Sequence, residues 1–175
     1  VEFARYADAA ANITVVDELE ALFEVGERVH QTMLERLARA KQAGERNSNE
    51  PLIVVVIDEF ANLMLMDTWL EADAKKQHKR LISRLIDMGM RARSANIRLV
   101  ISLQHPIDKH IPSALKFNCP SKILFRVPSR TYTALMFGDA DESLFPTHPR
   151  DLLPGQAYWQ APGHPPRLLQ GTFPG

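Results

Sequence analysis

The stretch PLIVVVIDEFAN, residues 51–62, is the part of the sequence around which the rest of the chain is organised. Residues 52–57 form a continuous apolar run that is mostly β-branched and is preceded by Pro51. Such a run predicts a strand buried on both faces, as in a parallel sheet. Asp58 and Glu59 follow the run directly. They therefore stand at the carboxyl end of a buried strand, where α/β proteins bind their ligands.

An apolar strand followed by Asp-Glu is the Walker B pattern of nucleotide hydrolases. In that pattern the Asp holds Mg²⁺, usually through water, and the Glu polarises the attacking water. We therefore interpret Asp58 as the metal carboxylate and Glu59 as the residue that activates water. In the alternative interpretation, Asp58 caps the next helix and Glu59 is solvated.

The composition suits one globular domain of 175 residues, 45% hydrophobic and 24% charged. Lys plus Arg and Asp plus Glu number 21 each, so any basic surface must be local. The single cysteine, Cys119, excludes an internal disulfide and fits a reducing, cytoplasmic compartment. No apolar run reaches the length of a membrane span. Because the chain begins at Val1 and ends in a Pro-Gly-rich tail, we expect both ends to be cuts from a longer protein.

Helical and strand patterns alternate along the chain, which predicts an α/β fold with a mainly parallel sheet. A long amphipathic helix is expected at 17–43, with Asp17 and Glu20 as its capping pair and Gly44 at its end. Its charged residues, Arg36 among them, are expected on a solvated face. The other expected elements are a strand end at 1–3, a short helix at 60–66, a loop at 67–73, a long helix at 75–96, a strand at 97–103, a short helix at 110–117, a strand at 121–127, a helix at 129–137 capped by Ser129, and a hairpin of 156–160 with 167–173.

Basic residues concentrate in one segment, with eight of them and a single acid, Asp87, between residues 75 and 98. Such a surface can face phosphate, either of a nucleotide or of a nucleic-acid backbone. It can equally be a solvated helix face with cations near its C-terminus, where the helix dipole favours them. Both interpretations remain open at this point.

A second polar residue stands at a strand end: Gln104 follows the strand expected at 97–103. Neighbouring strand ends in parallel sheets converge on one crevice, so Gln104 is placed to hydrogen-bond a γ-phosphate or the attacking water. A strand-end Gln can also simply cap a turn. The glycine-rich loop G-x-x-x-x-G-K-[ST] that normally cradles the phosphates is absent, because none of the eight glycines precedes a lysine. Either that loop lies upstream of Val1, or the carboxylates are not a complete site.

Other chemistries have little support in this sequence. It contains neither G-x-S-x-G nor H-E-x-x-H, and no cysteine-rich metal spacing. His105, Asp108 and His110 lie close together and suggest a metal site, although such a loop is more often solvated.

Several segments, in this order, resemble the FtsK/SpoIIIE-type DNA translocases: VEFARY, a long helix, PLIVVVIDEFANLM, RLIDMGMRARSANIRLVISLQHP and IPSALKFNCPSKILFRVPSRT. The resemblance implies a RecA-like P-loop NTPase core, a mainly parallel sheet flanked by helices, with a C-terminal hairpin. It implies that residues 1–175 are the later part of a motor domain whose Walker A loop lies upstream. Members of that family work as hexameric rings around double-stranded DNA. Conjugative coupling proteins and type VII secretion ATPases share the same core.

Residue by residue, the resemblance implies Asp58 as the Mg²⁺ carboxylate, Glu59 as the residue that activates water, and Gln104 as the γ-phosphate sensor. The position of the family's arginine finger, which reaches into the neighbouring subunit, is occupied by Lys122. Lysine lacks the bidentate fork of arginine, and we therefore consider Arg126, Arg130 and Arg93 as further trans-acting or phosphate-contacting residues. A second family arginine, used near DNA, falls at about Ala134. The segment 67–76 looks like an insertion relative to the family.

The resemblance thus implies an ATP- and Mg²⁺-dependent motor that moves double-stranded DNA, as in chromosome partition, in a homo-oligomeric ring. We expect it in the cytoplasm, with any membrane tether outside this chain. The alternatives are a type IV or type VII secretion or conjugative coupling ATPase, or a degenerate, non-catalytic motor module. Without a phosphate loop, the chain by itself is expected to bind ATP weakly and to be inactive.

Overall fold

The computed structural model describes residues 12–104, 111–138 and 142–171. The chain divides into two compact units. The first unit consists of Val1–Val55 and Met66–Leu99, and the second consists of Val56–Leu65 and Val100–Gly175. The boundary passes through two paired strands, and the units are described separately below.

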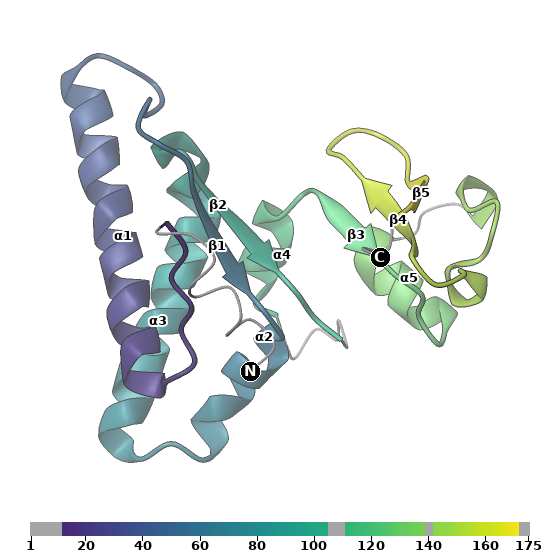
Figure 1. Cartoon of the computed structure of the whole chain (residues 1–175), viewed down its shortest axis with the longest axis horizontal. Helices are drawn as coiled ribbons and strands as arrows, with labels where there is room; N and C mark the ends of the chain where they lie inside the picture. Colours follow the sequence, from purple (N-terminus) through teal and green to yellow (C-terminus); the bar gives the residue numbers. More distant parts are fainter. Residues whose placement is uncertain (1–11, 105–110, 139–141, 172–175) are drawn as a thin grey trace. The chain divides into compact units, whose positions relative to one another are not determined.

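The first unit is built on two long helices that lie side by side, α1 (Leu19–Gln42) and α3 (Ala72–Arg91) (Figure 1). A short 3₁₀ helix, η3 (Ala92–Ala95), follows α3, and another, η2 (Met66–Thr68), precedes it. The buried residues recur at helical spacing, so each helix turns one apolar stripe inward. The buried apolar residues of α1, α3 and η3 are Phe23, Met33, Ala40, Leu81, Leu85, Met88, Ala92 and Ala95.

The ends of α1 agree only in part with the expected ones. Gly44 has a left-handed φ of 71° and ends the helix, as predicted. The predicted capping pair of Asp17 and Glu20 is wrong. Glu18 occupies the N-cap position, because the first helical hydrogen bond runs from the N–H of Leu22 to the carbonyl of Glu18. Its side chain makes no capping bond.

The helix expected at 75–96 begins earlier than its pattern suggested. Its first residue is Ala72, and Met66–Thr68 form a 3₁₀ turn, so only a short connection remains of the loop expected at 67–73. Residues 92–95 tighten into the 3₁₀ helix η3, and Asn96 then adopts a left-handed φ of 54°. A single left-handed residue reverses the chain at this point and leads it into the following strand.

Strands β1 (Ile53–Ile57) and β2 (Ile97–Ile101) pair with each other. The N–H of Ile53 bonds to the carbonyl of Asn96 before the strands, and the N–H of Ser102 bonds to the carbonyl of Ile57 after them. The first bond joins the beginnings of the two strands and the second joins their ends. The chain therefore runs in the same direction through both strands, and the pair is parallel.

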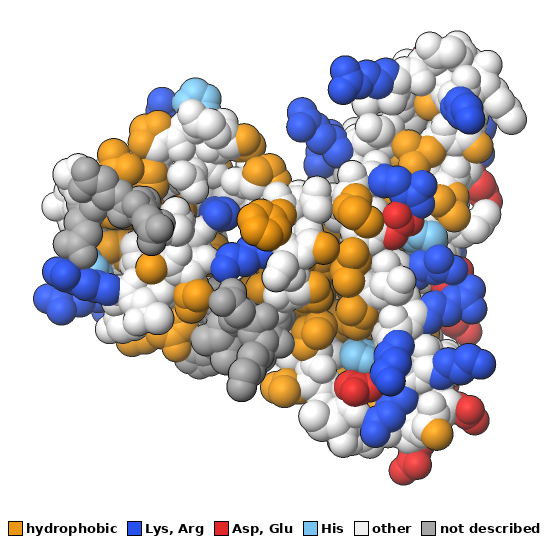
Figure 2. All heavy atoms as spheres, turned by 180° about the vertical axis from the view of Figure 1, so that it is seen from behind, with side chains coloured by type: hydrophobic (Ala, Val, Ile, Leu, Met, Phe, Trp, Pro, Cys, Tyr) orange, Lys and Arg blue, Asp and Glu red, His pale blue; other side chains and the backbone are white. Residues whose placement is uncertain are grey.

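Burial of β1 on both faces was expected, and this prediction is wrong. Val54 and Val56 are 51% and 58% exposed, whereas the intervening residues are half-buried. Successive side chains of a strand point to opposite sides, and no element in the described part of the chain covers the side that carries these two valines. Figure 2 shows hydrophobic side chains gathered on an exposed face of the molecule.

The second unit contains a three-stranded antiparallel sheet in the order β3-β4-β5. Its strands are β3 (Lys122–Leu124), β4 (Gln156–Gln160) and β5 (Arg167–Gln170). The last two confirm the predicted C-terminal hairpin. The helices of this unit are α2 (Phe60–Leu65), α4 (Ser113–Asn118), α5 (Arg130–Phe137), η5 (Glu142–Leu144) and η6 (Pro149–Asp151).

Tyr158 is the centre of the core of this sheet. It is fully buried, lies opposite Leu124 in the register, and meets the ring of Phe145 edge-on at 5.0 Å. Its hydroxyl donates to the carbonyl of Thr147 at 2.8 Å and accepts from the N–H of Thr147 at 3.1 Å. A buried tyrosine needs such a partner, and this one ties the preceding loop to the sheet. The rest of the cluster is Val127, Phe137 and Leu152.

Some predictions on local structure remain. Ser129 stands at the N-cap of α5, as predicted, without a side-chain capping bond. The strand end expected at residues 1–3 and the metal candidates His105, Asp108 and His110 lie outside the described residues. None of the described helices is both long and apolar enough to cross a membrane.

Candidate functional site

The end of β1 places two carboxylates in different surroundings. Asp58 is exposed, Glu59 is half-buried, and Phe60 begins α2 as a buried residue. The chain leaves the extended conformation at Glu59, and the two adjacent acids differ in exposure. Asp58 is left open to solvent, whereas Glu59 turns toward the protein.

Glu59 has an unusual backbone conformation, with φ at +48°. A residue with a side chain pays roughly 1–2 kcal/mol for the left-handed region, which glycine adopts freely. Strained backbone of this kind persists only where the surroundings hold it, and it gathers at functional sites. The strain at Glu59 therefore marks the turn between β1 and α2 as more than a connection.

Hydrogen bonds hold this turn against the segment after β2. The N–H of Phe60 donates to the carbonyl of Ser102 at 2.9 Å, beyond the last ladder bond between Ser102 and Ile57. Oε2 of Glu59 then accepts the backbone N–H of Gln104 at 2.9 Å. Glu59 and Gln104, predicted from separate strand ends, are thus brought together, and the alternative in which Glu59 is merely solvated does not hold.

The main chain of Gln104 makes this contact, whereas the prediction concerned its side chain, as a hydrogen-bond partner of a γ-phosphate or of the attacking water. The side chain of Gln104 is exposed. Its amide group is therefore free of the bond to Glu59 and lies on the solvent side of this turn, as does Asp58.

The residues present fit Mg²⁺ as a group held largely by water and phosphate. Mg²⁺ keeps several waters and typically takes one or two carboxylates together with substrate phosphates. Asp58 is an exposed carboxylate of the right chemistry. Within the described ranges, no cluster of three or more His, Cys, Asp or Glu side chains could form an all-protein metal cage. The donor set thus suits a metal that arrives with a nucleotide.

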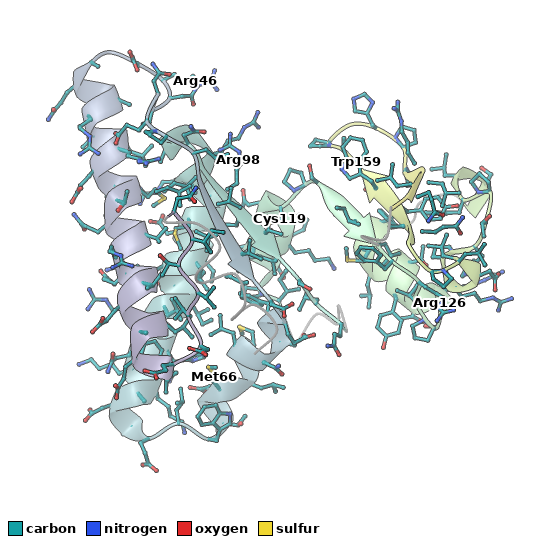
Figure 3. The ribbon with its side chains drawn as sticks, in the orientation of Figure 1. Arg46, Met66, Arg98, Cys119, Arg126 and Trp159 are labelled. Carbon is teal, nitrogen blue, oxygen red and sulfur yellow. The ribbon has the colours of Figure 1, made fainter. Side chains whose placement is uncertain are left out.

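The predicted trans-acting residues of the second unit lie at or after β3. Lys122 is half-buried at the start of the strand, and burial together with the nearby charge of Lys116 lowers its pKa. Arg126 is exposed after the strand (Figure 3), and Arg130 is the exposed first residue of α5. Among the described residues, neither Lys122 nor Arg126 forms a hydrogen bond or an ion pair with Asp58, Glu59 or Gln104.

The basic segment 75–98 proves partly structural. Arg80 and Arg84 both bind Glu27 of α1, at 3.0 and 3.3 Å, and Arg91 pairs with Asp87 one turn earlier on α3. These three arginines join or stabilise the two helices. Arg93 is different: it is exposed and lines a hollow together with Arg46.

Two features were not predicted from the sequence. Arg36 was expected on a solvated face, but only 6% of it is exposed. Its guanidinium donates to the carbonyls of Pro51 at 2.7 Å and Ala95 at 3.1 Å. Arg36 stands three residues after buried Met33 and four before buried Ala40, so helical spacing places it on the buried side, unlike exposed Arg39. The expectation of a solvated face rested on its charge. Arg46 lies in a polar turn, and its proximity to Arg93 is visible only in three dimensions.

Comparison with known proteins gives a consistent picture. A family model described as FtsK/SpoIIIE family matches residues 2–108. The chain is 34% identical over 137 residues to the DNA translocase SpoIIIE of Bacillus subtilis, covering 74% of this chain and 16% of that protein. It is 35% identical over 125 residues to DNA translocase FtsK 2 of Neisseria meningitidis, covering 70% and 11%. The chain thus spans less than a fifth of the length of these relatives.

Two solved structures share the fold. The pCW3 conjugation coupling protein TcpA, solved with ATPgS, superposes with a TM-score of 0.77 at 22% identity, covering 90% of this chain and 45% of that one. The cytoplasmic domain of the type VII secretion ATPase EccC of Thermomonospora curvata gives a TM-score of 0.63 at 19% identity, covering 88% and 18%. The predicted fold class, an α/β core of the RecA-like P-loop type, is confirmed.

Proposed function

Because this chain belongs to the FtsK/SpoIIIE family, we propose that it forms part of an ATP-driven motor that moves double-stranded DNA. The observation that carries the proposal is the turn at Glu59. A strained carboxylate follows strand β1 and is tied to a residue just after the neighbouring strand β2. A carboxylate held in one orientation at the end of a strand is suited to orient and activate water beside a bound nucleotide.

Each residue of the turn has a separate role in this proposal. Asp58 would hold Mg²⁺ through water, and the ion, when bound, would offset the charge of the phosphates. Glu59 would accept a proton from the attacking water on Oε1, since Oε2 is engaged by the N–H of Gln104. The hydrogen bond fixes the carboxylate in one orientation, and a fixed base needs no reorganisation when the reaction occurs. The exposed amide of Gln104 would contact the γ-phosphate.

Cations of the second unit would complete the site from a neighbouring subunit. Lys122 occupies the family's finger position, and Arg126 and Arg130 follow it along the chain. A hexameric ring of motor domains would bring such cations to the nucleotide of the adjacent copy. A cytoplasmic location, a membrane tether outside this chain and a role in chromosome partition belong to the same proposal.

The choice of DNA as the substrate rests on the sequence identities between this chain and its relatives. The relatives above 30% identity are named DNA translocases. The coupling protein and the secretion ATPase are similar at 22% identity or less and support the fold alone.

The proposal is tested by Glu59→Gln in the full-length protein. DNA-stimulated ATP hydrolysis should fall by at least about 100-fold, the range expected for loss of a general base, while nucleotide binding persists. Glu24→Gln is a matched control, because Glu24 is an exposed acid on α1, and it should leave hydrolysis unchanged. Persistence of hydrolysis in Glu59→Gln would show that Glu59 does not activate water.

A further inference from the structure

We propose that Arg46 and Arg93 form a phosphate-binding site in the first unit, separate from the carboxylates of the turn at Glu59. The two arginines line a hollow of about 340 Å³ together with Asn47 and Ser94. Ligand sites typically begin at about 300 Å³, so the hollow has room for one phosphate group. All four lining side chains are polar, and two of them carry a positive charge.

The two arginines lack the acidic partners that most of the other arginines of this unit have. In the part of the chain that the structure describes, neither guanidinium forms an ion pair, and both side chains are exposed. By contrast, Arg80, Arg84 and Arg91 are each paired with a carboxylate of α1 or α3. Two unneutralised guanidinium groups at one hollow are a favourable environment for an oxyanion.

Acidic residues are present in the same turn, but they are already engaged. Glu50 accepts two hydrogen bonds from Arg39, each at 3.0 Å, and lies 3.5 Å from the guanidinium of Arg36. Glu45 accepts from the amide of Asn49 at 3.1 Å. The charge of Glu50 is therefore compensated on the α1 side. Glu45 keeps its charge, because the amide of Asn49 is neutral, so two guanidinium groups stand against one uncompensated carboxylate and leave an excess of positive charge.

The loops that carry the two arginines are held together before any ligand arrives. The N–H of Ser48 donates to the carbonyl of Ser94 at 2.7 Å, and the side-chain amide of Asn96 donates to the carbonyl of Glu50 at 2.8 Å. The buried guanidinium of Arg36 joins the same two segments through Pro51 and Ala95. A site whose frame is fixed loses less conformational entropy on binding.

A third cation stands beside this hollow. Arg98, at the beginning of β2, donates to the carbonyls of Arg93 and Ile97 at 3.2 and 3.1 Å. Figure 3 shows the side chains of Arg46 and Arg98 toward the end of the unit at which β1 and β2 begin. Arg46 precedes β1, Arg93 precedes β2 and Arg98 is the second residue of β2, whereas Asp58 follows β1 and Gln104 follows β2. At its C-terminal end, the basic segment 75–98 thus carries arginines that are available for phosphate.

The phosphate that fits best is that of a DNA backbone, and this part of the inference rests on the proposed function. Arginine contacts to backbone phosphates position a protein on DNA without reading its sequence. Such contacts suit a motor that moves along DNA of any sequence.

The test uses the whole chain with Arg46→Ala, Arg93→Ala and the double variant. Arg28→Ala is the control, since it removes one exposed charge on α1. In the first arm, inorganic phosphate is titrated and the arginine Nε–H signals are followed by NMR. The signals of Arg46 and Arg93 should shift together as phosphate is added. In each single variant, the signal of the arginine that is still present should shift only weakly. Thermal unfolding of the variants should match that of the unchanged chain, because neither side chain belongs to the frame.

In the second arm, binding of a short double-stranded DNA is measured over a range of salt concentrations. The double variant should bind at least about tenfold more weakly, and the slope of log Kobs against log salt should fall by about one per lost phosphate contact. Arg28→Ala should change neither quantity comparably.

The outcomes separate the two inferences. Absence of phosphate-dependent shifts at Arg46 and Arg93 overturns the site, whatever Glu59→Gln does to hydrolysis. Shifts with phosphate but unchanged DNA binding in the double variant support the site and overturn DNA as the source of the phosphate.

Discussion

Oε2 of Glu59 accepts the backbone N–H of Gln104 at 2.9 Å, joining two residues that are 45 positions apart in the chain. Glu59 makes this bond from a left-handed backbone conformation. The contact and the strain occur at the same residue, which is the pattern expected where a side chain is held for chemistry at a cost in stability.

The strain at Glu59 can be measured by removing the side chain in two ways. Glu59→Ala loses the bond to Gln104 and keeps the unfavourable φ, whereas Glu59→Gly loses the bond and relieves it. Glu59→Gly should therefore be more stable than Glu59→Ala by about 1 kcal/mol in urea unfolding. Equal stability of the two variants would mean that residue 59 is not left-handed in solution.

Asp87 should give the chain an acid-sensitive stability. The hydrogen bond from Arg91 lowers the pKa of Asp87 below its ordinary value, burial opposes this, and the hydrogen bond with buried His30 adds to the lowering. A lowered folded pKa means that the stabilisation is complete above about pH 4, the ordinary pKa of Asp, and is lost as the pH falls through the folded value.

Asp87→Asn should therefore lower the free energy of unfolding near neutral pH by about 1–2 kcal/mol and flatten its decline below about pH 4. Asp151→Asn, at an exposed acid, serves as the control and should change the free energy by less than about 0.5 kcal/mol. An unaltered acid limb in Asp87→Asn would contradict the role of this pair. Urea unfolding at a series of pH values makes the comparison.

Arg36 and Arg39 both approach Glu50, yet they should differ strongly in their effect on stability. Arg36→Ala removes a buried guanidinium and leaves the carbonyls of Pro51 and Ala95 without their donor, which should cost about 3 kcal/mol. Arg39→Ala removes an ion pair that is half-exposed and should cost less than about 1 kcal/mol. Thermal or chemical unfolding of the two variants measures the two losses of stability. Similar losses would contradict the expected difference between Arg36 and Arg39.

Gly26 permits the close approach of α1 and α3. A Cβ at this position would lie 2.3 Å from Cδ1 of Leu81, a side chain that is only 4% exposed. Gly26→Ala should therefore destabilise the chain by about 1 kcal/mol, because overpacking outweighs the gain in helix propensity.

The overpacking of Gly26→Ala against Leu81 can be tested with a double-mutant cycle. Leu81→Ala alone should cost about 3 kcal/mol, and in the Gly26→Ala background it should cost at least about 1 kcal/mol less, since the added methyl then fills part of the space. Strict additivity of the two changes would show that the residues are not in contact.

The elements and their order could be predicted from the pattern of residues along the chain. Helical periodicity identified α1 and α3, the β-branched run identified β1, and the two acids after that run identified the turn at Glu59. These features are local, because a period or a strand end is written in neighbouring residues. The sequence was less informative about helix starts, where Glu18 replaced the expected Asp17 as the cap.

Which side chains of these elements meet became visible only in the three-dimensional fold. The burial of Arg36 depends on two carbonyls that come from segments after α1, and the exposure of Val54 depends on what covers its side of the sheet. The left-handed backbone of Glu59 is held by bonds to residues after β2, and the approach of Arg46 to Arg93 requires two distant turns to pack together. Such relationships depend on long-range contacts, and no local pattern of residue types encodes them.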